Sequence, residues 1–254
     1  MTNDASRLLP RHQSGLPASG GEPECPLVLI VDDDEAVRTA LQELLLSVGL
    51  DATCFASTRE LLGARLPARP GCLILDIRMP GLSGLDFQQH LASSGNRKPI
   101  IFLSGHADVA MTVKAMKAGA VDFLTKPVPE QGLLDAVSAG IARDIAQRAE
   151  DRIVKLHVER FATLTPRERQ VLHALAYGRI NKQIAFDLGI SEVTVKLHRG
   201  NVMRKMQAAS VGQLVRTWES MPIELRDGPL DDCIHGRRSG ICRPLEHNIS
   251  WRNI

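Results

Sequence analysis

Polar side chains that can do chemistry follow several short apolar runs of this 254-residue chain. Asp32 and Asp33 come directly after one run, and Asp76 ends another. Carboxylates held close together repel one another unless a cation joins them, and hard oxygen ligands with open positions suit Mg²⁺. A carboxylate beside Mg²⁺ can act as a nucleophile and accept a phosphoryl group, forming an aspartyl phosphate. These three acids therefore indicate a magnesium-dependent phosphoryl-transfer site, provided that the fold brings them together.

Two further polar residues occupy similar places. Ser104 follows a later apolar run, and Lys126 follows the last one. An ammonium and a hydroxyl group would offset the charge on the oxygens of a transferring phosphoryl group. The alternative is that each of the five is a solvated loop residue, but their common position at the ends of apolar runs favours one shared site.

The elements that must position these residues are short strands alternating with amphipathic helices. The pattern predicts an α/β doubly wound, five-stranded parallel sheet, because parallel neighbours need crossover helices. The expected strands cover residues 27–31, 52–55, 72–75, 100–103 and 121–124, and the expected helices cover 35–48, 57–65, 84–93, 108–118 and 130–147. In a flavodoxin-like sheet, ligands bind at the carboxyl ends of the strands between the first and third. We therefore expect one cleft, with Asp34 as a solvated neighbour or a helix cap.

The second half of the chain has a different pattern. Thr165 predicts a helix start as an N-cap, with Pro166 at the first helical position and Glu168 completing a capping box. A second short helix over residues 181–188 ends at Gly189, and Ser191 caps a third. Helix, tight glycine-containing turn, helix is the helix-turn-helix signature.

Charge separates the two halves. The chain as a whole has a net charge of +2, which taken alone argues against nucleic-acid binding. Residues 160–217 carry ten basic and three acidic side chains, a net of +7, whereas residues 25–147 carry eleven basic and fourteen acidic ones, a net of −3. A basic helix-turn-helix module predicts DNA binding, and the alternative is a solvated basic face.

The third helix of this module is the expected DNA reader. Its inward positions at helical spacing are Val195, His198, Val202 and Met206. Lys196 can donate to guanine acceptors, and Leu197 can contact a thymine methyl group. The residues predicted to contact DNA are Lys182, Thr194, Lys196, Leu197, Arg199, Gly200, Asn201, Arg204 and Lys205.

Residues 26–147 resemble the receiver domain of bacterial two-component response regulators. The resemblance rests on Val-Asp32-Asp33, Leu-Asp76-Ile-Arg-Met-Pro-Gly, Leu-Ser104-Gly-His, Ala-Gly-Ala-Val-Asp-Phe123 and Lys126-Pro127. It implies that Asp76 is the phosphoacceptor and that Lys126 binds the phosphoryl group. It further implies a Mg²⁺ site made by Asp32, Asp33, Asp76 and the backbone carbonyl of Arg78, and a switch pair made by Ser104 and Phe123. Phe123 as ordinary core is the alternative, and the Lys126–Pro127 bond is left open as cis or trans.

Residues 164–215 look like a LuxR-type helix-turn-helix, a four-helix module, through Leu-Thr-Pro-Arg-Glu-Arg, Asn-Lys-Gln-Ile-Ala and Thr-Val-Lys-Leu-His-Arg. Together the two halves resemble the NarL/FixJ class of regulators, although Val193 puts an apolar residue where such helices usually carry a polar one. The resemblance implies a transcriptional regulator that a sensor histidine kinase phosphorylates. The phosphorylated protein would form a homodimer, bind half-sites in double-stranded promoter DNA and act on RNA polymerase.

Two other functions are weighed. One is a regulator that ignores phosphorylation and is controlled by partner binding. The other is a phosphatase with an aspartyl nucleophile, which is disfavoured because Arg78 stands where such enzymes typically carry a second acid.

The remaining segments complete the expected organisation. Residues 1–25 are predicted to be a flexible leader without a signal peptide, 148–160 a helical linker, either rigid or a continued helix, 161–221 the helix-turn-helix domain, and 222–254 a disordered tail. Five scattered cysteines and the lack of any membrane-length apolar stretch indicate a cytoplasmic protein with reduced thiols. A zinc site is disfavoured because its candidate ligands have no familiar spacing; these are Cys233, His235, Cys242 and His247.

Overall fold

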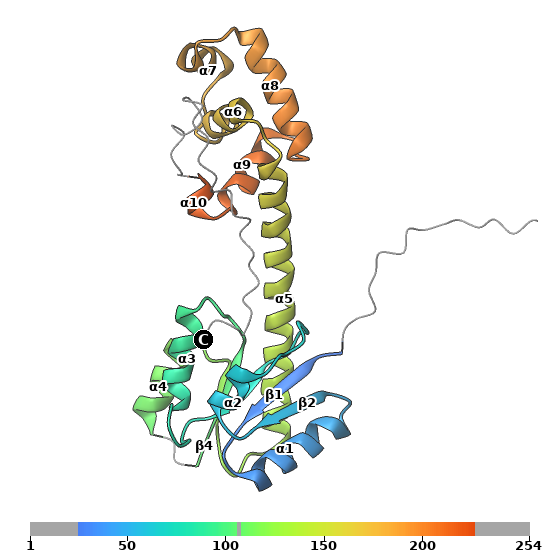
Figure 1. Ribbon diagram of the computed structural model, residues 1–254, viewed down its shortest axis with the longest axis vertical. Helices are drawn as coiled ribbons and strands as arrows, with labels where there is room; N and C mark the ends of the chain where they lie inside the picture. The colour runs from blue at the N-terminus through green and yellow to red at the C-terminus, as the bar shows by residue number, and fades with distance from the viewer. Residues whose placement is uncertain (1–24, 106–107, 227–254) are drawn as a thin grey trace, which may run out of the picture.

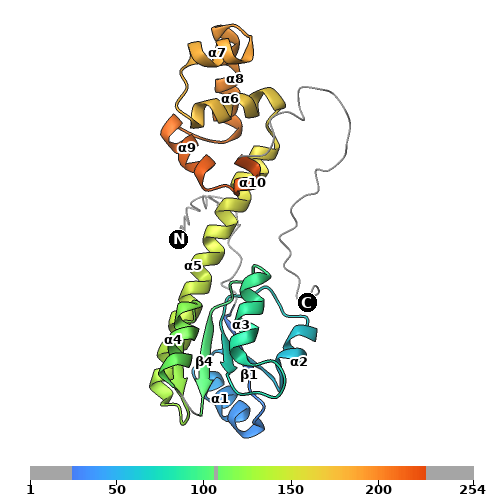
Figure 2. The same cartoon turned by 90° about the vertical axis from the view of Figure 1, so that its left-hand side faces the viewer.

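The computed structural model describes residues 25–105 and 108–226. They form an α/β module and a helical module, and one long helix runs from the first into the second (Figures 1 and 2). The predictions for the leader before residue 25, for the four zinc candidates and for the tail beyond residue 226 fall outside the described residues.

The α/β module is built on one five-stranded sheet in the order β2-β1-β3-β4-β5, with every neighbouring pair parallel. Its strands are β1 (Leu27–Val31), β2 (Asp51–Phe55), β3 (Leu73–Asp76), β4 (Ile100–Ser104) and β5 (Asp122–Thr125). Every residue of β1, β3 and β4 is buried, as expected for central strands covered on both faces. The predicted doubly wound, flavodoxin-like sheet is confirmed.

Helices cover both faces of this sheet. They are α1 (Glu35–Ser47), α2 (Thr58–Gly63), α3 (Gly84–Ser93), α4 (Val109–Lys117) and the first part of α5 (Glu130–Ala162). Successive strand residues point to opposite faces, so Leu29 belongs to the core that includes Phe87 of α3, and Ile30 to the core that includes Leu133 of α5. Asp34 accepts hydrogen bonds from the first backbone N–H groups of α1, so it is a helix cap.

The helical module contains α6 (Pro166–Ala176), α7 (Asn181–Leu188), α8 (Glu192–Lys205), α9 (Val211–Glu219) and the short α10 (Ile223–Arg226). The capping box is present, with Thr165 and Glu168 each accepting from the other's backbone N–H. Gly189 has a φ of +63°, the left-handed conformation expected at the end of α7. Leu225 of α10 packs against the module's core, so the folded module extends past the predicted boundary at residue 221.

Helix α5 has 33 residues and is about 50 Å long at 1.5 Å per residue. It contains both the helix expected at 130–147 and the segment 148–160, which is therefore a continued helix. Leu133 and Val137 lie in the sheet core, whereas Phe161 lies in the core of the helical module. One uninterrupted helix thus has an end in each core. Among the described residues, no helix combines the length and the apolar character needed to cross a bilayer.

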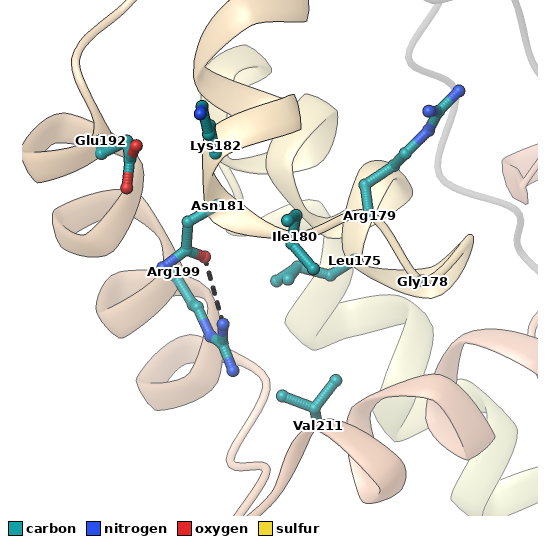
Figure 3. Close-up of a pocket in the computed structure, with 9 residues that line it drawn as sticks. All are labelled: Leu175, Gly178, Arg179, Ile180, Asn181, Lys182, Glu192, Arg199 and Val211. Carbon is teal, nitrogen blue, oxygen red and sulfur yellow. Dashed lines mark hydrogen bonds between the residues drawn. The ribbon is translucent and has the colours of Figure 1, made fainter.

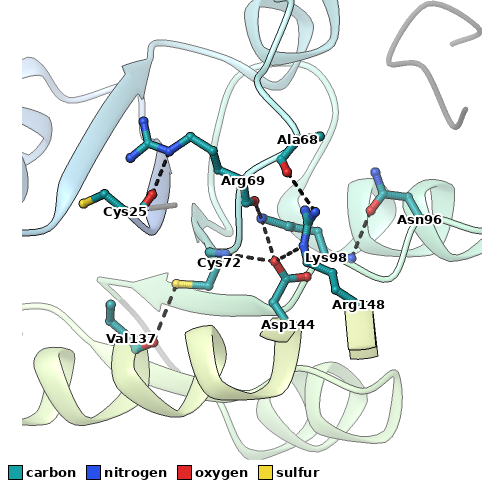
Figure 4. A network of polar contacts seen from close by, with 10 residues as sticks. Cys25, Ala68, Arg69, Cys72, Asn96, Lys98, Val137, Asp144 and Arg148 are labelled. Carbon is teal, nitrogen blue, oxygen red and sulfur yellow. Dashed lines mark hydrogen bonds and ion pairs between the residues drawn. The ribbon is translucent and has the colours of Figure 1, made fainter. Parts of the chain in front are cut away.

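A buried polar network fixes α5 to the edge of the sheet where β3 and β4 begin (Figure 4). One carboxylate oxygen of Asp144 accepts from the backbone N–H of Gly71 at 2.9 Å, from Lys98 at 3.1 Å and from Arg148 at 2.8 Å. Arg148 also donates to the carbonyl of Ala68. Close packing adds to this anchor, since a Cβ on Gly140 would lie 2.9 Å from the Cβ of Cys72 on the sheet.

Candidate functional sites

The three predicted acids come together at the carboxyl ends of β1 and β3, which are hydrogen-bonded neighbours. Oxygens from Asp32, Asp33 and Asp76 all lie within 4.8 Å of one another. Asp32 and Asp76 are buried, whereas Asp33 is exposed, so the cluster opens to solvent on one side. Hard oxygen ligands with open positions fit Mg²⁺, which keeps several waters when protein-bound.

Lys126 follows β5 and reaches into this acidic pocket. Its Nζ lies 2.5 Å from Asp32 Oδ2 and 3.0 Å from Asp76 Oδ2, and its peptide bond to Pro127 is cis. Burial acts to lower the pKa of the Lys126 ammonium, but its hydrogen bonds to the two carboxylates outweigh this and raise the pKa. Burial raises the pKa of Asp32, opposed by its hydrogen bonds from Lys126 and the Asp34 backbone. One cation thus balances three carboxylates only in part.

Backbone groups hold the two buried carboxylates in place. The N–H of Asp34 donates to Asp32 at 3.0 Å, and the N–H of Arg78 donates to Asp76 at 3.2 Å. The structure therefore places the backbone of Arg78 beside the proposed phosphoacceptor. Two residues that sequence reasoning missed also shape the pocket. Arg38 of α1 donates to the carbonyl of Asp32, and a Cβ on Gly84 would lie 2.6 Å from the carbonyl of Asp76. Arg38 could have been found as the basic residue of the first turns of α1.

The proposed switch pair lies on the two strands beyond β3. Ser104 is fully buried at the end of β4 and sits at the same carboxyl edge as Asp76. Phe123 is half-buried on the edge strand β5, and its ring centroid lies 6.4 Å from that of Phe102 at a tilt of 42°. The structure thus brings together Asp32, Asp33, Asp76, Ser104 and Lys126 at one edge, with Phe123 packed on the neighbouring core.

The basic module presents α8 as predicted. Val195, Val202 and Met206 are buried in the core, and His198 is half-buried. On the opposite face Val193 is 76% exposed and Leu197 64% exposed. The predicted contacts Lys196, Gly200 and Arg204 are exposed on this helix, and Thr194 and Asn201 are partly exposed.

A basic pocket of about 530 Å³ flanks this helix (Figure 3). Lys182 comes from the start of α7 and Arg199 from α8, so two predicted contacts border one hollow. Arg199 donates to the side-chain oxygen of Asn181 at 3.1 Å, which fixes the guanidinium beside the N-terminus of α7. Arg179 also lines the pocket, although its place between the first two helices of the module marked it only as part of the basic charge.

Lys205, also predicted to contact DNA, is held in an internal ion pair. Its Nζ lies 2.6 Å from Glu168 Oε2 and 3.1 Å from the carbonyl of Thr163. Glu168 is buried, and a buried carboxylate requires a partner. Burial acts to raise the pKa of Glu168, but the hydrogen bonds from Lys205 and Thr165 outweigh it and lower the pKa. Helical spacing alone placed Lys205 beside the groove, and the structure assigns it to an internal ion pair.

Comparison with known proteins matches both modules. Residues 28–138 match the response regulator receiver domain, and residues 162–218 match the luxR family of bacterial regulatory proteins. Nodulation protein W of Bradyrhizobium diazoefficiens is 49% identical over 78% of this chain and 87% of its own length. The response regulator protein TodT of Pseudomonas putida is 48% identical over 77% of this chain and 86% of its own length.

A third relative and a solved structure agree with these two. The transcriptional regulatory protein FixJ of Azorhizobium caulinodans is 45% identical over 76% of this chain and 92% of its own length. The response regulator StyR, known from a low-resolution structure, has a TM-score of 0.66 and 45% identity, covering 77% of this chain and 98% of that one. The chain therefore belongs to the two-component response regulators that join a receiver domain to a LuxR-type DNA-binding domain.

Proposed function

We propose that phosphorylation of Asp76 switches this chain between a resting state and a form that pairs on promoter DNA. The observation that carries the proposal is the placement of Asp76 in an acidic pocket with Lys126 hydrogen-bonded to it, in one chain with a basic helix-turn-helix module. The phosphoryl donor is the phosphohistidine of a sensor kinase, and the ligand of the basic module is double-stranded DNA.

The transfer step follows from the position of Asp76. One of its carboxylate oxygens attacks the phosphorus of the phosphohistidine, so that a P–O bond forms while the P–N bond breaks and the leaving imidazole nitrogen takes a proton from water. The Lys126 ammonium, 3.0 Å from Asp76, neutralises charge on the incoming phosphoryl oxygens. The chain's own chemistry ends with hydrolysis of this phosphate, and we infer no turnover of an external substrate.

Mg²⁺ is the cofactor that the pocket fits. Asp32, Asp33, Asp76 and the backbone carbonyl of Arg78 would hold it, since the three carboxylates lie within 4.8 Å of one another and Lys126 supplies only one positive charge. When bound, Mg²⁺ supplies charge neutralisation for the phosphoryl group.

Ser104 and Phe123 are the proposed link from the pocket to the surface. The Ser104 hydroxyl, buried at the carboxyl edge, turns toward the new phosphoryl oxygens. The half-buried Phe123 ring then moves into the space that opens. This movement changes the face made by α4, β5 and α5, so that a local charge change favours pairing of two copies.

DNA reading is assigned to α8 in the major groove. Lys196 and Leu197 contact base edges, with Thr194, Gly200 and Asn201 along the same helix. Lys182, Arg199 and Arg204 contact phosphates, and the basic pocket beside α7 supports this for the first two. Two paired modules would bind half-sites about one helical turn apart and thereby act on RNA polymerase.

The exposure of α8 bears on how the switch works. Val193 and Leu197 are exposed on the reading face with the receiver present in the same chain. This supports activation by pairing of two copies rather than by release of a masked DNA-binding module.

Labelling with acetyl phosphate and Mg²⁺ tests the phosphoacceptor. We expect about one phosphoryl group per wild-type chain and at least a hundredfold less for Asp76→Asn. Asp86→Asn, an exposed acid on α3, is the control and should label like wild type. Equal labelling of Asp76→Asn and wild type would overturn the assignment.

A further inference from the structure

An apolar stripe runs along the middle of α5. It consists of Ala142, Ile145, Ala146, Ala149, Ile153 and Leu156, all of which are exposed. The exposed fractions of the three large side chains are 48% for Ile145, 54% for Ile153 and 42% for Leu156. Solvated segments of a helix normally carry polar residues on such a face, so this α5 stripe requires an explanation.

The spacing within the α5 stripe is that of a coiled coil. Ala142, Ala149 and Leu156 recur every seventh residue, and Ala146 and Ile153 interleave with them at steps of three and four. These are d and a positions of one heptad register, which hold the seam of a supercoiled helix pair. The α5 stripe covers about two heptads, or about 21 Å of helix.

Both modules leave this face of α5 open. Val137, Gly140 and Asp144 pack on the sheet, and at 100° per residue they lie about half a turn from the α5 stripe. At the other end, Phe161 enters the helical module's core, also off the stripe. In Figures 1 and 2 the middle of α5 spans the distance between the two modules.

The residues of the register point to a second copy of this chain as the occupant. A β-branched Ile at an a position followed by Leu at d, here Ile153 and Leu156, favours a parallel two-stranded pair. The flanking positions are compatible with this orientation. Parallel helices bring Arg152 at a g position beside His157 at an e position, and Ile145 beside Glu150, so neither flanking pair joins two carboxylates or two guanidinium groups.

We propose that the α5 stripe is a parallel contact between two copies of this chain. Such a pair has both helical modules at the same end, as two adjacent DNA half-sites require. The inference deepens the dimerisation step of the proposed function and rests on it. Since two heptads make a short coiled coil, the contact adds to pairing by other surfaces rather than replacing it.

Analytical ultracentrifugation of the full chain, activated with beryllofluoride and Mg²⁺, measures the dimer dissociation constant and so tests the contact. We expect Ile153→Glu to weaken dimerisation at least tenfold, because the seam would bury a carboxylate without a partner. Lys155→Gln changes the net charge equally on a different face of α5 and should leave dimerisation within twofold of wild type. Circular dichroism checks that both variants keep their helix content.

Cysteine cross-linking tests the register and the occupant. In a parallel pair the a positions face each other, so Ile153→Cys should form a disulfide between two copies, whereas Asp151→Cys, on the opposite face, should not. Native Cys25, Cys233 and Cys242 are changed to Ser in one set and kept in a second set.

Each outcome decides the inference. Cross-linking between copies at residue 153 together with the weakened Ile153→Glu dimer supports it. A wild type that dimerises while Ile153→Glu dimerises equally overturns the α5 contact but leaves the dimerisation step standing. A wild type that stays monomeric overturns both. A disulfide formed within one chain when the native cysteines are kept would show that a segment of the same chain covers the α5 stripe, and this also overturns the proposal.

Discussion

Two clusters of charged side chains lie at opposite edges of the sheet. They contain similar residue types but differ in how completely the charges are paired. In the acidic pocket, one ammonium pairs with two of three carboxylates, and the third, Asp33, remains exposed. In the network at the other edge, Asp144 is buried and one of its oxygens accepts three hydrogen bonds, two of them from cations (Figure 4). The first cluster has excess negative charge and an open side, whereas the second is closed and paired.

The difference separates a site for chemistry from an anchor. Excess charge at an open edge is offset when a cation or another charged group binds, so the acidic pocket can respond to a ligand. A closed network gains nothing from a ligand and instead fixes the elements that supply its members. Asp144 and Arg148 belong to α5, and their partners Lys98 and Gly71 precede β4 and β3, so the network holds the connecting helix on the receiver.

Breaking the closed network should have the largest effect on stability. Asp144→Ala leaves Lys98 buried without its counter-charge, and burial already acts to lower the pKa of that ammonium. We expect a loss of about 3–5 kcal/mol in the free energy of unfolding, measured with urea. Asp151→Ala, an exposed acid on the same helix, should stay within about 0.5 kcal/mol of wild type. A small effect of Asp144→Ala would show that the network does not anchor α5.

Breaking the ion pair between Glu168 and Lys205 in the helical module should also lower the free energy of unfolding, but by less. Glu168→Gln should cost about 1–3 kcal/mol at pH 7, because Lys205 and the Thr165 backbone lose a charged acceptor. Since the folded-state pKa of Glu168 lies below its ordinary value of 4.5, its contribution is present above that pH and is lost as the pH falls through the folded-state pKa. Urea titrations at several pH values should therefore show the two proteins converging in acid. Exposed Glu219→Gln is the control, and a pH-independent difference would contradict the charge-based account.

Measurements of DNA affinity should distinguish the exposed Lys182 from Lys205, which is paired with Glu168 inside the helical module. Lys182→Ala should weaken binding by about 1 kcal/mol and reduce the slope of log affinity against log salt by about 1, because one phosphate contact is lost. Lys205→Ala should leave that slope unchanged and destabilise the module instead, since Lys205 pairs with Glu168. Equal slopes for Lys182→Ala and wild type would remove Lys182 from the interface.

A substitution in the acidic pocket should have the smallest effect on the free energy of unfolding, and it should stabilise the protein rather than destabilise it. Asp33→Asn removes one of three mutually repelling carboxylates, so without Mg²⁺ we expect unfolding to require about 0.5–1 kcal/mol more than in wild type. Added Mg²⁺ should stabilise wild type and have little effect on the variant, because binding to the folded state raises its stability. If Mg²⁺ stabilises both equally, Asp33 is not a ligand.

The residues of the acidic pocket could be predicted from the sequence because they stand at the ends of apolar strands. That position is visible in the alternation of the chain, and β-strand order then brings Asp32, Asp76 and Lys126 together. The network around Asp144 gave no such signal. Gly71 is 73 residues away from Asp144 and contributes only a backbone N–H, which no residue type reveals.

Two further differences have the same physical origin. Helical spacing put Lys205 near the groove, but it carries no information about the buried Glu168 in α6 that pairs with Lys205. The predicted end of the helical module is residue 221, because the apolar pattern fades there. In the structure, Leu225 still packs against the core. Periodicity predicts which face of a helix or strand is buried. Tertiary contacts decide which charged side chains are paired and where a folded module ends.

DNA affinity with and without the phosphoryl mimic beryllofluoride tests whether phosphorylation of Asp76 controls DNA binding. The full chain is titrated with its mapped operator at fixed salt and Mg²⁺, alongside Asp76→Asn. We expect beryllofluoride to tighten wild-type binding at least tenfold, or about 1.4 kcal/mol, and to leave the affinity of Asp76→Asn unchanged. Equal affinity of wild type with and without beryllofluoride would contradict it and would favour a regulator controlled by partner binding.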